Sequence, residues 1–283
     1  MPELPEVETL RRQLEKEVIK KTVADLEAKS SRVLKRLHPQ SLSKELLKKT
    51  IEQVTRKGKY IIIGFNNSLC LAIHLGMSGQ ILFTPKKSTR GKNNPPEEKI
   101  PHLYLTMRFT DGSALRYVDP RTFGQILLLK DLAELQELTE LGFDPLEAAI
   151  PWVEFASYLV NQKSSLKAIL TNQSFIAGIG NIYADEILFA AGLRPDRDPK
   201  SLSTQEIRRL YRSIGEVLTE AVKHRGSTLA DKSYVDIYGN YGEYQQYHNV
   251  YAREAMSCKR CRGTVQKIKY QGRSTYFCPL CQR

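Results

Sequence analysis

The apolar positions at the start of the chain follow helical spacing, and charged residues lie between them. They are Val7, Leu10, Leu14 and Val18. Pro2 stands just before them, where proline commonly begins a helix, and acids occupy the opening turn. The pattern therefore predicts an amphipathic helix at the N-terminus.

Residues 51–131 form short apolar runs separated by turn residues, which is typical of β-strands. The runs are KYIIIGF, LCLAIHLG, GQILFT, HLYLTMRFTDG, SALRYVD and GQILLLKD. Because the turns are close and no helix intervenes, we expect a sandwich or barrel-like β domain. The segment at 88–101 has no periodicity, so we expect a mobile loop there.

The pattern becomes helical after about residue 132, and prolines at 145 and 151 mark a boundary between domains. Residues 203–224 predict the clearest helix, with STQE as a capping box and one apolar face that core packing explains. The segment 236–254 is rich in tyrosine and glycine. It is either a loop that orders around a ligand or an irregular structural connection.

Four of the five cysteines lie near the C-terminus, in CKRC and CPLC, with sixteen residues between the two pairs. Two such knuckles can place four thiolates tetrahedrally around one structural Zn²⁺, which leaves no coordination position for water. Two disulfides are the alternative, which a chain without a secretion signal makes the weaker one. The ligands are Cys258, Cys261, Cys278 and Cys281, whereas Cys70 fits a buried strand.

The 283 residues include 43 Lys and Arg against 31 Asp and Glu, a formal net charge of +12 that suggests a polyanionic partner. No apolar run approaches the length of about 20 residues that a membrane span needs. The opening lacks the basic-then-apolar layout of a signal peptide. We therefore expect a soluble, intracellular protein with no membrane partner.

Two features sharpen the polyanion hypothesis. In GIGNIYADE, glycines precede a helix whose backbone N–H groups, together with Asn181, are suited to hold a phosphate. The cysteine-rich segment is strongly basic, and QGR between two alternating runs predicts a hairpin with Arg273 at its tip. A zinc ribbon that binds only protein is the alternative.

Six motifs, spread over nearly the whole chain, together resemble the bacterial formamidopyrimidine-DNA glycosylases, also called Fpg or MutM. They are PELPEVET at 2–9, GKY at 58–60, HLGMSG at 74–79, RYVDPRTFG at 116–124, GIGNIYADE at 178–186 and GRSTYFCPLCQ at 272–282. The resemblance implies an α+β fold: an N-terminal β-sandwich with a leading helix, then a helix-two-turn-helix domain and a zinc-finger hairpin, with DNA held between them. We expect domains at 1–135, 151–250 and 251–283, with a linker at 136–150.

The resemblance gives the N-terminus a chemical role. Once Met1 is removed, Pro2 carries a secondary α-amine, and such amines are partly neutral at pH 7. Attack on the sugar C1′ would give an iminium that cannot lose a proton to a neutral imine, so it acts as an electron sink. By resemblance, Glu3 is the general acid/base and Glu6 supports the helix end.

Other roles also follow from the resemblance. Lys59, Arg273 and Asn181 would contact phosphates, and Lys59 and Arg273 would also assist base release and the final elimination. Because an extruded nucleotide leaves a gap in the duplex, residues must fill it. Met77, Arg121 and Phe123 match the residues that do so, although Met77 and Phe123 would otherwise be read as core. His102 is a lesser candidate for DNA contact.

Four positions depart from the family pattern: Ile100 for a DNA-contacting histidine, Thr122 for a second arginine, and Arg225 and Ala252 for glycines. They leave lesion preference less defined than reaction type. The sequence therefore predicts a cytoplasmic, nucleoid-associated bacterial enzyme, a monomer that acts on damaged double-stranded DNA. It would remove 8-oxoguanine and formamidopyrimidines and cleave the strand by β,δ-elimination. Alternatives are an endonuclease VIII-like enzyme for oxidised pyrimidines and a non-catalytic zinc-dependent DNA-binding homologue.

Overall fold

The computed structural model describes residues 2–29, 32–35, 38–86, 100–147, 150–270 and 272–283. The chain forms two compact units. The sheet unit contains Pro2, Glu6–Thr139 and Ser227–Gly242, and the helical unit contains Glu3–Pro5, Glu140–Gly226 and Glu243–Arg283. The units are therefore not contiguous in sequence. The loop expected at 88–101 lies outside the described residues except for its last two positions.

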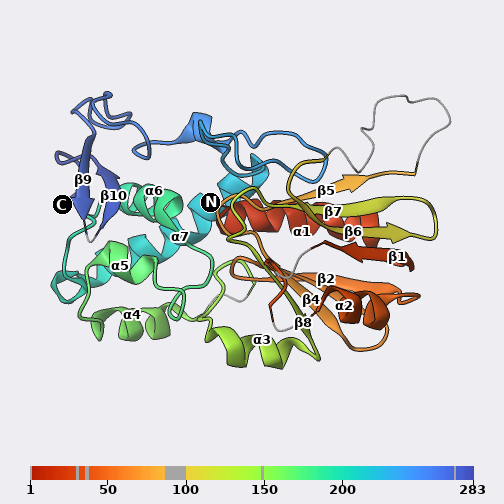
Figure 1. The fold of residues 1–283 in the computed structure, drawn as a ribbon. Coiled ribbons are helices and arrows are strands. Elements are labelled where there is room, and N and C mark those ends of the chain that lie inside the picture. Colours follow the sequence, from red (N-terminus) through yellow and green to blue (C-terminus); the bar gives the residue numbers. More distant parts are fainter. Residues whose placement is uncertain (1, 30–31, 36–37, 87–99, 148–149, 271) are drawn as a thin grey trace. The chain divides into compact units, whose positions relative to one another are not determined.

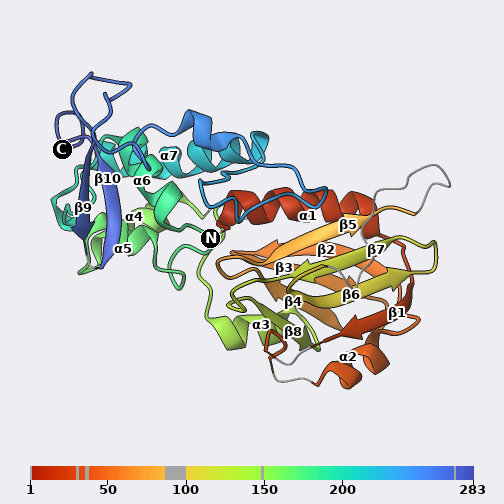
Figure 2. The ribbon, with the colours of Figure 1, turned by 45° about the horizontal axis from the view of Figure 1, so that its top comes forward.

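The sheet unit contains two four-stranded antiparallel sheets (Figures 1 and 2). One has the order β1-β6-β7-β5, from Val23–Ala28, Leu103–Phe109, Ala114–Val118 and Gln80–Thr84. The other has the order β2-β3-β4-β8, from Ile51–Lys57, Tyr60–Phe65, Cys70–His74 and Gln125–Leu129. Its helices are α1 (Leu4–Val18, of which the first two residues count to the helical unit), α2 (Pro39–Leu46) and α3 (Leu132–Thr139).

The two sheets share one hydrophobic core, which confirms the predicted sandwich. The predicted apolar face of α1 packs into this core, and all four of its residues are buried. Strand β3 is apolar without alternation because both of its faces are covered. Ile61 and Ile63 face the main core, whereas Ile62 and the buried Cys70 belong to a second cluster with Leu135 of α3.

The helical unit has one helix that is buried on nearly all sides, α6 (Asn181–Ala191). The predicted helix at 203–224 is α7 (Thr204–Lys223), and Ser203 and Glu206 form the predicted capping box. Figure 1 shows α6 beside the C-terminal hairpin. The other elements are α4 (Trp152–Val160), α5 (Leu166–Leu170), η2 (Pro199–Ser201), η3 (Tyr244–Tyr247), β9 (Gln266–Tyr270) and β10 (Arg273–Phe277).

Two consecutive acids of α6 hold an irregular segment and the C-terminal hairpin in place. The buried Glu186 carboxylate accepts hydrogen bonds from the backbone N–H groups of Asn249, Val250 and Tyr251 at 2.9–3.0 Å. Asp185 accepts one from the backbone N–H of Tyr276 in β10, at 2.9 Å. The tyrosine-rich segment is thus fixed from inside the unit where it meets α6, as a structural connection would be.

The first part of the tyrosine-rich segment, residues 236–242, belongs to the sheet unit. The N–H of Phe83 in β5 donates to the carbonyl of Ile237 at 2.7 Å, and the side chain of Gln80 donates to the carbonyl of Ser233 at 2.9 Å. These bonds attach residues 227–242 to the edge strand of a sheet. No helix within the described ranges is long and apolar enough to cross a membrane.

Candidate active site

Glu3 lies at the N-terminal end of helix α6, inside the helical unit. Its side chain is only 2% exposed and accepts hydrogen bonds from three backbone N–H groups. These bonds come from Gly180 at 2.8 Å, Ile182 at 3.0 Å and Tyr183 at 3.2 Å. The positive end of the helix dipole adds to them, because it favours a carboxylate at this position. Glu3 is therefore a fixed carboxylate adjacent in sequence to Pro2.

Two glycines let the chain approach Glu3 closely. A Cβ on Gly180 would lie 2.4 Å from Cδ of Glu3, nearer than any non-bonded contact allows. Gly178 has φ of +101°, and its carbonyl accepts the N–H of Leu4 at 3.0 Å. The GIG sequence is therefore required by the packing around Glu3–Leu4.

The N-terminal end of α6 is not arranged as the phosphate-binding site that the sequence suggests. Three of its N–H groups donate to Glu3, so a phosphate cannot use them without displacing that carboxylate. Asn181, half-buried in the first turn, remains as the polar side chain at this end. Its Oδ1 is buried and has no hydrogen-bond partner in the described part of the chain. Asn181 is thus the member of the motif whose polar group is not fully used by the fold.

The sheet unit places Pro2, Glu6 and Lys59 in buried positions. Glu6 accepts a hydrogen bond from the backbone N–H of Ser227 at 2.6 Å, which joins α1 to the segment that returns to this unit. Lys59 follows Gly58 in the turn between β2 and β3 and is 8% exposed.

Arginine and histidine side chains surround the turn that carries Lys59. Arg56 donates to Glu8 and to the carbonyl of Gly58, both at 3.0 Å, and so braces this turn. Burial, followed by the positive charge of Lys59, lowers the pKa of His74 to about 4. His74 is therefore neutral at pH 7, and its Nδ1 accepts the N–H of Gly76 at 3.1 Å.

Four predicted contact residues are exposed on loops of the sheet unit: Met77, His102, Arg121 and Phe123. Met77 is 40% exposed and Phe123 is 60% exposed, so neither is a core residue. Apolar side chains of this size at loop tips are suited to contact a partner. The structure brings these loops together through Asp119, which the sequence analysis did not single out.

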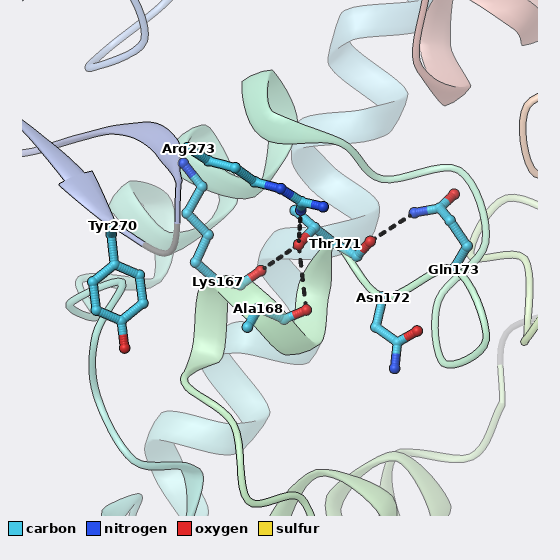
Figure 3. A pocket seen from close by; sticks show the side chains of 7 residues that line it. All are labelled: Lys167, Ala168, Thr171, Asn172, Gln173, Tyr270 and Arg273. Atoms are coloured by element: carbon cyan, nitrogen blue, oxygen red, sulfur yellow. Dashed lines mark hydrogen bonds between the residues drawn. The ribbon is translucent and has the colours of Figure 1, made fainter. Parts of the chain in front are cut away.

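Arg273 begins β10 and is exposed beside a pocket of about 390 Å³. Figure 3 shows its guanidinium directed at Thr171, where Nη1 donates to Oγ1 at 2.8 Å. Thr171 in turn donates to the carbonyl of Lys167, at 3.0 Å. The hydroxyl therefore orients Arg273, and within the described part of the chain other N–H groups of its guanidinium remain for a ligand. The pocket is lined by Lys167, Ala168, Thr171, Asn172, Gln173, Tyr270 and Arg273.

A buried ion pair, which the sequence analysis missed, supports the hairpin behind Arg273. Lys167 lies 2.7 Å from Asp185 and donates to the carbonyl of Ser274 and the hydroxyl of Thr275, both at 2.9 Å. Burial raises the pKa of Asp185 and lowers that of Lys167, and the attraction between the two charges opposes both shifts. The available signal was an acid pair inside an otherwise apolar helix, because acids are rarely buried without partners.

The four C-terminal cysteines are grouped. Their sulfur atoms all lie within 4.8 Å of one another, with Cys258–Cys281 at 3.8 Å and Cys261–Cys278 at 3.4 Å. Zn–S bonds of about 2.3 Å in a tetrahedron separate sulfurs by about 3.8 Å, which matches this spacing. The arrangement therefore fits a metal with four thiolate ligands.

Three of the four departures from the family pattern occupy left-handed backbone positions. Thr122, Arg225 and Ala252 have φ of +57°, +59° and +57°. Glycine adopts this conformation without the steric cost of about 1–2 kcal/mol that a Cβ brings. This explains why glycine suits the last two positions, and it means that this chain carries local strain there. Ile100 lies in the described part of the chain with no special backbone angle.

Comparison with protein-family models gives three matches along the chain. Residues 1–126 match the formamidopyrimidine-DNA glycosylase N-terminal domain and residues 141–233 match the formamidopyrimidine-DNA glycosylase H2TH domain. Residues 258–283 match the zinc finger found in FPG and IleRS. The last match contains the four grouped cysteines, so the C-terminal module is a zinc finger.

Curated relatives carry the same family name. The formamidopyrimidine-DNA glycosylase of Heliobacterium modesticaldum is 38% identical over the whole of both chains. That of Pelotomaculum thermopropionicum is 36% identical and covers 100% of this chain and 99% of its own.

Solved structures show the same fold. The Lactococcus lactis Fpg in complex with an abasic site containing DNA is 34% identical, with a TM-score of 0.87 and 99% of each chain covered. The same protein with a FAPY-dG containing DNA gives a TM-score of 0.85, over 99% of this chain and 100% of the other. The chain belongs to the formamidopyrimidine-DNA glycosylase family.

Proposed function

We propose that this protein is a bifunctional DNA glycosylase and AP lyase of base excision repair that removes oxidised purines from duplex DNA. The observation that carries the proposal is the buried Glu3 carboxylate, held by three backbone N–H groups directly after Pro2. The relatives named above support the substrate class, because the Lactococcus protein was solved with abasic and FAPY-dG DNA.

The reaction begins at the α-amine of Pro2 after removal of Met1, which lies outside the described residues. The nitrogen attacks C1′ of the damaged nucleotide, a C1′–N bond forms, and the bond from C1′ to the base breaks. The departing base takes up a proton. The nitrogen loses its proton, the C1′–O4′ bond breaks and O4′ takes up a proton, so that an iminium joins Pro2 to the opened sugar. The iminium draws electrons from C2′, which loses a proton as the bond from C3′ to its phosphate oxygen breaks. A second elimination releases the 5′ phosphate.

Glu3 supplies the proton transfers in this scheme, because it is the carboxyl nearest in the chain to the reacting amine. Its three N–H donors fix the carboxylate in one orientation, so it needs no rearrangement during the reaction. Glu6 supports the start of α1 through its bond to Ser227.

Basic and polar side chains position the DNA. Lys59, Asn181 and Arg273 contact phosphates, and Lys59 and Arg273 also assist the departure of the base and of the last phosphate. Asn181 is suited to this because it is only half-buried at the first turn of α6 and its side-chain NH₂ group can donate to a phosphate oxygen.

Exposed loop residues occupy the gap that the extruded nucleotide leaves in the duplex. Met77 acts as an apolar wedge, Arg121 faces the orphaned base and Phe123 stacks beside it, consistent with the exposure of all three. His102 makes a lesser DNA contact.

The zinc finger binds one structural Zn²⁺ through Cys258, Cys261, Cys278 and Cys281. When bound, the ion orders the knuckles that support the hairpin, and four thiolates leave no position for catalytic water. We further propose that the protein is a monomer located in the bacterial cytoplasm, at the nucleoid, as suits its DNA substrate and the bacterial origin of its relatives.

Glu3→Gln should abolish excision of 8-oxoguanine from duplex DNA, with a loss of at least about 100-fold, because it removes the proton-transfer group. Binding to the damaged duplex should persist. Single-turnover excision and a binding titration measure the two effects, and a melting curve confirms folding. Glu15→Gln is the matched control, since Glu15 lies on α1, which follows Glu3, and is an exposed acid paired with Arg11 of the same helix.

Two outcomes of this experiment would contradict the proposal. Excision by Glu3→Gln at the wild-type rate would show that Glu3 is not the proton-transfer group. Wild-type protein that excises oxidised pyrimidines faster than 8-oxoguanine would favour the endonuclease VIII-like alternative.

Removal of zinc should release the hairpin and weaken DNA binding by at least tenfold, because metal-binding free energy is folding free energy in so small a module. Metal analysis should give one zinc per chain before chelation. Cys258→Ser should reproduce the loss, whereas Cys70→Ser, at the buried cysteine of β4, should keep both zinc and binding. Full affinity of zinc-free protein for damaged duplex would refute the role of the module.

Arg273→Ala should weaken binding to damaged and undamaged duplex alike and reduce the slope of log K against log salt by about one. If Arg273 also stabilises the departing phosphate, strand cleavage falls more than base release at saturating DNA. Arg212→Ala on α7, where Arg212 is exposed and pairs with Glu216, is the control. An unchanged slope with normal cleavage would exclude a phosphate contact at Arg273.

A further inference from the structure

We propose that Asp119 is a positioning residue that locks the loops carrying Met77, Arg121 and Phe123 into the arrangement needed to enter the DNA gap. The proposal rests on the gap-filling role proposed above for those three residues. All of the groups involved belong to the sheet unit.

Asp119 joins the two loops through its side chain. It is fully buried after the end of β7, and its Oδ1 accepts a hydrogen bond from the Ser78 hydroxyl at 2.6 Å. Its Oδ2 accepts the N–H of Gly124 at 2.8 Å and the Tyr117 hydroxyl at 3.3 Å. One carboxylate therefore connects the residue after Met77 with the residue after Phe123.

The backbone around Asp119 extends the same network. The N–H of Arg121 is shared between Ser78 Oγ at 3.1 Å and Asp119 Oδ1 at 3.3 Å. The carbonyl of Asp119 accepts the N–H of Thr122 at 3.3 Å, and its own N–H donates to the carbonyl of His102 at 3.0 Å. The third loop with a predicted contact residue is thus attached to the same point.

Glycines allow the loops to touch without side chains between them. A Cβ on Gly76, where φ is +58°, would lie 2.5 Å from the backbone of Phe123. A Cβ on Gly124 would lie 1.7 Å from the Tyr117 hydroxyl. The contact between the loops is backbone against backbone, so a change in one loop must move the other.

Only a carboxylate satisfies every group that faces Asp119. The facing groups are two backbone N–H groups and two hydroxyls, and all four can donate. Burial, and after it the Asp119 charge, raises the pKa of Tyr117 well above its usual range, so this hydroxyl stays a donor. Asparagine at this position would turn an NH₂ group toward one of the donors and leave a buried group without an acceptor.

The network orders the backbone beneath exposed side chains. Met77 and Phe123 reach solvent, while the residues next to them are tied to a fully buried acid. Ordering before binding removes an entropic cost that DNA would otherwise have to offset when the loops insert. Loss of Asp119 should therefore slow insertion into a duplex and leave phosphate contacts unchanged.

The test uses Asp119→Asn and three substrates: a duplex with 8-oxoguanine, the same duplex with 2-aminopurine beside the lesion, and the damaged strand alone. We expect duplex excision and the fluorescence phase that reports insertion to slow at least tenfold. Excision from the single strand should stay within about twofold, because no base pair is opened there. The salt dependence of binding should not change, since no phosphate contact is lost.

Matched variants separate positioning from general damage. Asp111→Asn is the control, because Asp111 also holds a turn at an end of β7, through the N–H and hydroxyl of Ser113. It should behave as wild type. Ser78→Ala removes two bonds from the network, the one to Asp119 and the one from the N–H of Arg121, and should show the same duplex-specific loss to a smaller degree. It serves as the test if Asp119→Asn does not fold.

Wild-type duplex kinetics in folded Asp119→Asn, or in Ser78→Ala if Asp119→Asn does not fold, would overturn the proposal. An equal loss on single-stranded substrate would also overturn it, since that indicates a damaged catalytic centre. Phe123→Ala distinguishes this failure from that of the gap-filling role. If Phe123→Ala loses duplex excision while Asp119→Asn does not, gap filling stands and positioning by Asp119 fails. If Phe123→Ala excises normally, gap filling fails and the proposal with it.

Discussion

The hydrogen bonds between the Glu3 carboxylate and the N-terminal end of α6 are the interaction on which the rest of the helical unit and the proposed chemistry depend. The first N–H groups of a helix have no partner within the helix, and a buried carboxylate needs hydrogen-bond donors. Each group therefore offsets the free-energy cost of burying the other. Hydrogen bonds to a charged group contribute about 1.5–3 kcal/mol each. Gly178 and Gly180 are needed here because a Cβ at these positions would clash with Leu4 and Glu3, respectively.

Acidic side chains on α6 itself also accept hydrogen bonds from backbone N–H groups. Asp185 and Glu186 accept backbone N–H groups from the hairpin and from residues 249–251, as Glu3 accepts those of the helix itself. The half-buried Asn181 lies in the first turn of the same helix, and Lys167 connects Asp185 to the strand that Arg273 begins. Within the helical unit, helix α6 therefore positions Asn181 and Arg273, the two residues proposed to contact phosphates. The acids of α6 find hydrogen-bond donors inside the same unit.

Parts of this fold with a local signal were predictable from sequence. The apolar face of α1, the six strands from β3 to β8 and the capping box of α7 follow from periodicity, and the zinc finger follows from cysteine spacing. Strand β1 and helix α2 were missed, and β2 lies in the predicted β region but outside the six runs. In β1 and β2, buried and exposed positions do not alternate regularly.

Other parts depend on contacts that no local pattern contains. Backbone groups form hydrogen bonds that attach residues 227–242 to the sheet unit. Backbone N–H groups are also among the partners of the Glu3 and Asp119 carboxylates. Backbone N–H groups leave no mark in a sequence, so the acids could be noticed but their partners could not. The roles of the site residues and the domain boundaries at 135, 150 and 250 stay predictions.

We propose that the α-amine of Pro2, next in sequence to the fixed Glu3, forms the covalent link to DNA. Reduction with borohydride during reaction with 8-oxoguanine duplex, followed by mass spectrometry of the digested adduct, tests it directly. We expect one DNA-linked peptide, which begins at Pro2 and has lost Met1, because only a free secondary amine gives the persistent iminium. An adduct on an internal lysine such as Lys59, or trapping by protein that retains Met1, would contradict it.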